Sequence, residues 1–494
     1  MLQLNDISKL RSDVIGFFRF KKFDDSRYLI TNDVGMYSFL EKEDFLHFIA
    51  GKIDALSSQK KHELAGKKFI LDDSYANDMA HMYETKNTFL KQGPALHIMV
   101  LTLRCNHACK YCHASIVGEK ITGKDMTVEI AQNVVDTIFY SSSNEINIEF
   151  QGGEPLLNYE VLKFIVAYAR KRAKYLGKHV NFLLITNLSL MDEEKMNYLI
   201  DNNVQLSTSL DGDEEVHNSN RTYAKGNSFE KVVYWIDRIN TEYKKRGIKN
   251  TIGALTTVTK KGLGRWKELV DLYLSLGMKG VFIRPLNPYG FARHNLDELG
   301  YTPQEFNEFY DNIIRYITEI NKKGTKFREY FTTIYLQKIL NNQDPNFVDE
   351  RSPCGATIGQ VAYNYTGKIY TCDEGRMFSE MGDENFQVTT ATDNPEENYK
   401  NMIDSDVTKS MMQASLLDAM PGYNESVYKP YIGICPVNNY KKTGNIFPNY
   451  KHDDRIVIST HVLDYIFSKI EDPEYFSMFQ GWVGGNDFNI SCDL

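Results

Sequence analysis

The stretch Leu103-Arg-Cys-Asn-His-Ala-Cys-Lys-Tyr-Cys-His113 contains three of the seven cysteines of this chain. Cys105, Cys109 and Cys112 follow the spacing CxxxCxxC, which can place three thiolates on three irons of one cubane cluster. The fourth iron would then have no protein ligand. Because a cluster that only transfers electrons usually has four cysteine ligands, this spacing predicts an enzyme that binds a small molecule at an open iron.

Zinc binding and dithiol redox chemistry are the main alternatives, since Cys-x-x-Cys pairs serve both. A zinc ribbon would normally supply a second close pair. The other four cysteines, Cys354, Cys372, Cys435 and Cys492, form no such pair. The spacing therefore favours an iron–sulfur cluster.

The flanking segments predict where this cysteine loop lies. The apolar run 97–103 is typical of a buried strand that ends where the cysteines begin. A second predicted strand, 145–150, leads into Gln151-Gly-Gly-Glu-Pro155. Adjacent glycines let a ligand approach the backbone, and the neighbouring carboxylate can accept hydrogen bonds from an ammonium group. Glycine pairs are common after strands, so this turn is informative only beside the cysteine motif.

Together the two segments resemble the radical S-adenosylmethionine (SAM) superfamily. In that family CxxxCxΦC, with an aromatic residue at Φ, binds a [4Fe–4S] cluster, and a GGEP loop holds the amino group of SAM. The resemblance implies that the open iron chelates SAM and that one electron cleaves its sulfonium bond to give a 5′-deoxyadenosyl radical. It implies SAM-binding roles for Tyr111, Gln151, Gly152, Gly153, Glu154, Pro155, Thr186, Asn187, Ser209, Asp211 and Arg221. Judged from the residues alone, Thr186, Ser209 and Asp211 are equally well explained as strand-end caps.

Composition agrees with this interpretation. A chain of 494 residues with 42% hydrophobic and 25% charged content should form two or three domains. Its net charge of −8 argues against a general nucleic-acid binder. We find no apolar run long enough to span a bilayer and no secretion signal at the amino terminus, so we expect a cytoplasmic protein. An odd number of cysteines, three of them in one loop, fits reduced thiolates better than disulfides.

Residues 94–325 alternate apolar strands with amphipathic helical segments, which predicts a βα-repeat with a parallel sheet. Thr127 is an expected helix N-cap, and Gly277 is an expected helix stop. The predicted helices span 127–139 and 266–274, and the six predicted strands span 97–103, 145–150, 182–185, 204–209, 251–256 and 280–284. The fold class is therefore α/β, and the resemblance implies a partial (β/α)6 barrel that is open on one side.

Residues 1–93 form a separate predicted α+β module. Segments 14–20 and 27–31 are predicted as a strand pair, followed by a helix at 43–50. Such a module could bind a leader peptide by adding a strand to its sheet. Structural packing against the barrel explains it equally well.

Residues 326–494 contain a second cysteine pattern. Cys354 precedes a predicted hairpin, 360–372, with Gly367 at its turn and Cys372 at its end. This spacing resembles the opening of the SPASM domain of peptide-modifying radical enzymes, although only Cys435-Pro436 remains of the later cysteine run. The resemblance implies one auxiliary [4Fe–4S] cluster on Cys354, Cys372 and Cys435 and no outer cluster. The fourth position is open, filled by a ligand other than cysteine, or filled by Cys492.

Asp373 follows Cys372 directly. In similar sulfatase-maturing enzymes the aspartate at this place is a proposed base for the substrate proton. A carboxylate beside a cluster and shielded from water could have the raised pKa that this role needs. As an alternative, Asp373 caps the hairpin.

The layout most resembles maturases of the His-Xaa-Ser peptide systems, through Gly93-Pro-Ala-Leu-His97, Tyr370-Thr-Cys-Asp-Glu-Gly-Arg-Met377 and Gly433-Ile-Cys-Pro-Val437. This implies hydrogen abstraction from a ribosomally made peptide, leading to a crosslink, an oxidation or an epimerisation. Implied partners are a flavodoxin or ferredoxin reductant and a second maturase. Two alternatives stay open: a radical SAM enzyme whose small-molecule substrate binds a twitch-type auxiliary cluster, and a noncatalytic partner in a maturation complex.

Overall fold

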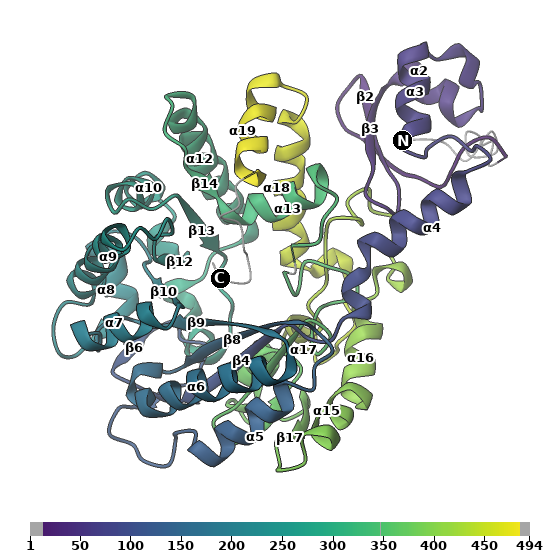
Figure 1. Cartoon of the computed structure of the whole chain (residues 1–494). Coiled ribbons are helices and arrows are strands. Elements are labelled where there is room, and N and C mark those ends of the chain that lie inside the picture. The colour runs from purple at the N-terminus through teal and green to yellow at the C-terminus, as the bar shows by residue number, and fades with distance from the viewer. Residues whose placement is uncertain (1–12, 346, 485–494) are drawn as a thin grey trace.

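The computed structural model describes residues 13–345 and 347–484, and its centre is a curved parallel sheet (Figure 1). Neighbouring strands pair in the order β13-β12-β10-β9-β8-β4, and every pair among them is parallel. These strands are β4 (Leu96–Thr102), β8 (Glu145–Gly152), β9 (His179–Ile185), β10 (Val204–Ser209), β12 (Gly253–Thr257) and β13 (Gly280–Arg284). The six predicted strands and the α/β fold class are confirmed.

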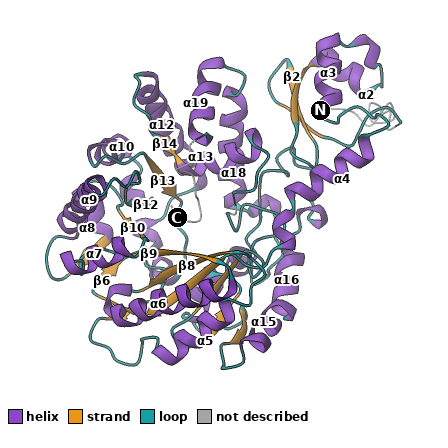
Figure 2. Ribbon diagram, in the orientation of Figure 1, coloured by secondary structure: helices purple, strands orange, loops and turns teal. Residues whose placement is uncertain are grey.

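Helices between the strands cover the outer face of the sheet (Figure 2). They are α5 (Val128–Ile138), α6 (Tyr159–Leu176), α7 (Glu193–Asp201), α8 (Glu214–Asn220), α9 (Ser228–Lys245), α10 (Trp266–Ser275) and α12 (Pro303–Lys322). As predicted, the side chain of Thr127 caps α5 by accepting a hydrogen bond from the Ile130 N–H. Gly277 ends α10 with φ +71°, a conformation that glycine adopts without strain.

The sheet continues beyond the barrel at both ends. The predicted hairpin forms from β15 (Gln360–Tyr363) and β16 (Lys368–Tyr370), with Gly367 at φ +85° in its turn. Strand β15 pairs with β4 in parallel, and β17 (Gln387–Thr390) extends the hairpin. At the opposite end β14 (Arg328–Glu329) pairs with β13. One sheet of ten strands therefore crosses the domain boundary predicted at residue 325.

The amino-terminal module has its own sheet and its own apolar core. Strands β1 (Arg19–Lys22), β2 (Arg27–Thr31) and β3 (Tyr37–Glu41) form an antiparallel sheet, followed by α2 (Lys42–Ile49), α3 (Ser58–Gly66) and α4 (Tyr75–Lys86).

The strand predicted at 14–20 begins only at Arg19, which corrects that boundary. The backbone just before it bonds elsewhere: Gly16 N–H donates to Phe69 O, and Val14 O accepts from Leu71 N–H.

The C-terminal helices complete the main core. Helix α13 (Tyr330–Leu340) packs against α18 (Asp454–Lys469) and α19 (Pro473–Val483), and α18 also packs against α12 (Figure 1). Their buried apolar side chains join those of the barrel in one cluster. Within residues 13–345 and 347–484, no helix has the length and apolar character needed to cross a membrane.

Candidate active site

A cavity of about 300 Å³ lies inside the barrel, between the two sets of cysteines. All six cysteines in the described part of the chain line it: Cys105, Cys109, Cys112, Cys354, Cys372 and Cys435. None of them forms a disulfide. The cavity therefore brings together two motifs that are more than two hundred residues apart in the sequence. Cys492 lies outside the described residues.

The first cysteine loop leaves β4 and is held by short strand pairs. Strand β6 (His107–Cys109) pairs with β11 (Arg221–Tyr223) in antiparallel register, and Arg221 lies opposite Cys109. The other pair joins β5 (Arg104–Cys105) to β7 (Val117–Gly118). Because β11 follows α8 directly, the register places the Arg221 guanidinium beside the cysteine loop.

Gly152 and Gly153 are packed against the backbone that precedes the cysteines. A Cβ atom on Gly152 would collide with the carbonyl oxygen of Thr102, and one on Gly153 would collide with that of Arg104. Those carbonyls accept hydrogen bonds of 2.8 Å from the N–H groups of Gly153 and Glu154, respectively. The contact between the two loops thus requires glycine at both positions, whether or not a ligand also approaches them.

The Glu154 carboxylate is fully buried and joins this turn to the end of β9. One oxygen accepts from Thr186 Oγ1 at 2.8 Å and from Leu156 N–H at 3.0 Å. The other accepts from Asn187 N–H at 2.8 Å. The carboxylate that we expected to accept from an ammonium group is therefore already bound by three donors of the protein.

Tyr111, Arg221 and Asp211 form a buried hydrogen-bond chain. Arg221 Nη1 donates to the Tyr111 hydroxyl at 2.6 Å, and that hydroxyl donates to Asp211 Oδ2 at 2.8 Å. Burial raises the pKa of the Asp211 carboxyl, and the Arg221 guanidinium opposes this effect. The chain fixes the Tyr111 ring at the wall of the cavity.

The predicted SAM-binding residues fall into two groups. Those that line the cavity are Tyr111, Gln151, Gly152, Gly153, Thr186, Asn187, Ser209 and Arg221. Glu154, Pro155 and Asp211 are buried behind this wall, and Glu154 and Asp211 hydrogen-bond to residues that line the cavity. Eight of the eleven residues therefore line the cavity, and Glu154 and Asp211 are hydrogen-bonded to members of that lining.

Two of the three cysteines of the second set lie at helix starts. Cys372 Sγ accepts from Gly375 N–H at 3.4 Å and caps α14 (Asp373–Ser379). Cys435 Sγ accepts from Asn438 N–H at 3.4 Å and caps α17 (Pro436–Thr443). With Cys354 these thiols belong to an apolar cluster that also contains Tyr289, Phe378, Phe386 and Met411.

These thiols fit iron–sulfur clusters by their chemistry. Burial raises the pKa of every one, to about 12 for Cys109 and Cys354, so each keeps its proton until a cation replaces it. Among the described residues, no group of three or more His, Cys, Asp or Glu side chains is arranged to hold a single metal ion. A cluster spreads its thiolates over separate irons, and the N–H groups at Cys372 and Cys435 stabilise thiolate charge.

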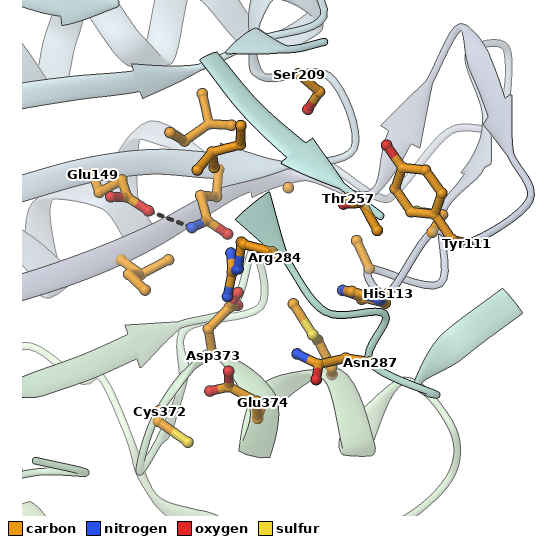
Figure 3. Close-up of a pocket in the computed structure, with 18 of the residues that line it drawn as sticks. Tyr111, His113, Glu149, Ser209, Thr257, Arg284, Asn287, Cys372, Asp373 and Glu374 are labelled. Atoms are coloured by element: carbon orange, nitrogen blue, oxygen red, sulfur yellow. Dashed lines mark hydrogen bonds between the residues drawn. The ribbon is translucent and has the colours of Figure 1, made fainter. Parts of the chain in front are cut away.

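Glu149, Arg284 and His113 also line the cavity, and the sequence analysis missed all three. Figure 3 shows Arg284, at the end of β13, between Glu149 and Asp373. Burial raises the pKa of Glu149 to about 8, and its side chain accepts a hydrogen bond from Gln151 Nε2. The one available signal was a charged residue between apolar neighbours in a predicted strand, Ile148-Glu149-Phe150.

Asp373 lies at the cavity wall beside Cys372 (Figure 3). Its Oδ1 accepts from Arg376 Nη2 at 2.7 Å, and Arg376 is fully buried. The cap of α14 is the Cys372 thiol, while Asp373 is the first residue of that helix. Asp373 is thus held by a buried guanidinium at the second cysteine set.

Comparison with known proteins agrees with this geometry. Residues 99–272 match the family model of the radical SAM superfamily. A cysteine-type anaerobic sulfatase-maturating enzyme of Clostridium perfringens is 25% identical over 278 residues, which are 54% of this chain and 71% of that enzyme.

Two solved structures share the fold. The structure of anSMEcpe with bound AdoMet has a TM-score of 0.63 at 18% identity. The match covers 79% of this chain and 98% of the anSMEcpe chain. Streptococcus suis SuiB bound to precursor peptide SuiA has a TM-score of 0.50 at 13% identity and covers 89% of this chain and 98% of its own.

Residues 99–272 therefore form a match to a radical SAM domain, and this segment includes the CxxxCxxC motif and part of the cavity lining. Over about half of its length the chain is similar to the anaerobic sulfatase-maturating enzymes.

We predict that Gly153→Ala destabilises the protein, because its methyl group collides with the Arg104 carbonyl. The expected loss in the free energy of unfolding is about 2 kcal/mol, with a lower iron content after reconstitution. Gly118→Ala is the matched control, because Gly118 has open space where its Cβ would lie. Thermal unfolding and iron analysis measure both effects, and equal results for the two variants would contradict the packing argument.

We predict that Glu149→Gln stabilises the protein at alkaline pH. The pKa of Glu149 is about 8 in the folded protein and 4.5 in the unfolded chain. Between these pH values the unfolded chain releases the proton of Glu149 and the folded protein keeps it. The free energy of unfolding therefore falls as the pH rises through this range. Glutamine keeps an acceptor for Gln151. The variant should gain up to about 4 kcal/mol at pH 8 and little at pH 5. Denaturant unfolding between pH 5 and 8 measures this, and a gain independent of pH would contradict it.

Proposed function

We propose that this chain is a radical SAM enzyme that cleaves SAM reductively and modifies a ribosomally made peptide by hydrogen abstraction. The observation that carries the proposal is one cavity lined by the CxxxCxxC cysteines, by the Gln151–Gly153 turn and by the second cysteine set. When bound, a [4Fe–4S] cluster supplies the electron that converts SAM into methionine and a 5′-deoxyadenosyl radical.

In this proposal Cys105, Cys109 and Cys112 hold the SAM-binding cluster. Arg221 provides a positive charge for the SAM carboxylate, and its hydrogen bond to Tyr111 keeps the aromatic ring at the cavity wall. Glu154 fixes the glycine turn relative to Thr186 and Asn187, whose side chains line the same end of the cavity.

Cys354, Cys372 and Cys435 hold one auxiliary [4Fe–4S] cluster at the other end. Asp373 accepts the proton that the substrate loses, and Arg376 orients its carboxylate. For a crosslink or an oxidation, a cluster on these cysteines would supply a route for the electron that the substrate radical loses, with a flavodoxin or ferredoxin as the acceptor. Epimerisation is redox-neutral, because a hydrogen atom returns to the substrate radical, and it would need no acceptor.

A peptide substrate is supported by the relatives. Sulfatase-maturating enzymes act on a protein by their name, and SuiB was solved with a precursor peptide. In the amino-terminal module β1 and β3 are the edges of a three-stranded sheet, so either could pair with a leader peptide. We place the enzyme in the cytoplasm, where thiolate ligands stay reduced.

The two cysteine sets should separate into two activities. We predict that Cys112→Ala abolishes 5′-deoxyadenosine formation under dithionite. Cys372→Ala should keep that activity but lose modified peptide, because only the auxiliary cluster is removed. Iron analysis of anaerobically reconstituted protein should give about eight irons per chain for the wild type and about four for each variant. Wild-type protein that holds iron but forms no 5′-deoxyadenosine would disprove the proposed function.

The base role of Asp373 has its own test. We predict that Asp373→Asn leaves 5′-deoxyadenosine formation intact and lowers the yield of modified peptide by about 10²-fold or more, the usual worth of a positioned base. Mass spectrometry of candidate precursor peptides measures the product. Asp383→Asn, on an aspartate that accepts from Tyr440, is a control outside the cavity lining. Full product formation by Asp373→Asn would exclude the role.

A further inference from the structure

A second hollow lies where helix α4 of the amino-terminal module meets the C-terminal part of the chain. Figure 1 shows α4 running from the module toward those segments. The hollow has an inner part of about 60 Å³ and an outer part of about 450 Å³. The two parts share the lining residues Lys86, Phe89, Asn342, Gln343, Asp344 and Arg351.

Lys86, the last residue of α4, lines both parts of this hollow. Its Nζ atom is buried and has no hydrogen-bond partner among the described residues. The Nζ atom lies over the Tyr431 ring, 5.8 Å from the ring centroid. Gly35 leaves room for the ammonium group, since a Cβ there would lie 2.5 Å from Nζ.

Lys338 contributes a second buried ammonium group to the same lining. It donates to two neutral carbonyls, Glu350 O and, at 2.9 Å, Tyr431 O. In the described part of the chain, no carboxylate lies within ion-pair distance of Lys86 or Lys338. Two residues of the lining therefore carry buried ammonium groups that have no direct counter-ion.

The other charges of the lining are already paired. Lys429 binds Asp33 at 2.9 Å and also binds Asp418. Asp344 lies 4.0 Å from Arg351. These pairs leave the ammonium groups of Lys86 and Lys338 as the charges that an added anion would neutralise.

Burying an uncompensated ammonium group is unfavourable. Burial lowers the pKa of Lys86 to about 7, and repulsion from Lys338 adds to this effect. An anion between the two ammonium groups would offset both the cost of burial and the repulsion between the two lysines. The two lysines thus have the arrangement of an anion site.

The size and the remaining charges of the hollow define the anion. The inner part holds a few water-sized atoms, which is enough for a carboxylate and too little for a nucleotide. Asp33, Asp344 and Asp418 also line it, and their negative charges disfavour a phosphate dianion more than a carboxylate. The outer part, which Gly93 and Gly359 also line, has room for the chain that bears the carboxylate.

We propose that this hollow binds a carboxylate group of a peptide, either an acidic side chain or a terminal carboxylate, between Lys86 and Lys338. The proposal rests on the proposed function, because the peptide is the substrate of that reaction. It assigns a recognition site for acidic peptides at the seam between the module and the C-terminal region, separate from the cysteine-lined cavity.

The test uses reconstituted holoenzyme and three probes: acetyl-Gly-Glu-Gly-amide, acetyl-Gly-Gln-Gly-amide and acetyl-Gly-Gln-Gly with a free carboxylate. Calorimetric titration should show that at least one carboxylate peptide binds tenfold or more tightly than the neutral amide. Preference for the first probe identifies a side-chain carboxylate, and preference for the third identifies a terminal one. Equal affinity for all three probes, or no binding of any, would overturn the proposal.

Lys86→Met should remove the carboxylate preference. It should also raise the melting temperature without ligand, because a buried ammonium group is replaced by an apolar side chain of similar length. Lys91→Met is the matched control, since Lys91 is exposed and pairs with Glu84. Retained preference in a folded Lys86→Met protein would refute the site. If Lys86→Met does not fold, Lys338→Met provides the same test.

Formation of 5′-deoxyadenosine under dithionite is measured on the same samples. Normal formation without carboxylate preference overturns only this site. Absence of formation in the wild type overturns the proposed function, and the peptide titrations then still report on the site.

Discussion

The architecture of the candidate active site depends on a backbone contact between the Gly152-Gly153 turn and residues 102–104. Two hydrogen bonds of 2.8 Å join these segments, and no space remains for a Cβ on either glycine. Because the contact joins the ends of adjacent strands β4 and β8, it fixes the starting point of the cysteine loop on the rigid sheet. The same turn places Glu154 where it can bind the end of β9.

The cysteine loop is also held at its far end. Phe291 N–H donates to Cys112 O at 2.8 Å, and Asn295 Nδ2 donates to Lys110 O at 2.9 Å. Gly290, at φ +51°, allows this approach, because a Cβ there would collide with the Cys112 carbonyl. With the β6–β11 pair, these contacts restrain the loop along its length. A site that positions a reactive species benefits from such restraint.

The cavity is completed by long-range pairing. Strand β15 adds to the barrel at β4, so the hairpin between Cys354 and Cys372 lies against the first strand of the barrel. That pairing brings Asp373 and the second cysteine set into the lining of the cavity that the predicted SAM-binding residues also line. The amino-terminal module has a core of its own, and it also joins the C-terminal region through apolar and polar contacts: Phe39 packs against Phe467 in the main core, and Asp33 pairs with Lys429.

The sequence by itself determined the α/β class, the six barrel strands, the Thr127 cap, the Gly277 stop and the Gly367 hairpin, because each depends on local periodicity or turn chemistry. It also identified the six cysteines that line the cavity, since ligand spacing is visible along the chain. Only the tertiary structure showed that Glu154 is bound by protein donors, that Glu149 and Arg284 face the cavity, and that Lys86 and Lys338 share a hollow without a counter-ion. These features depend on contacts between segments that are distant in the sequence. The separation of two residues along the chain does not determine how close they lie in the folded protein.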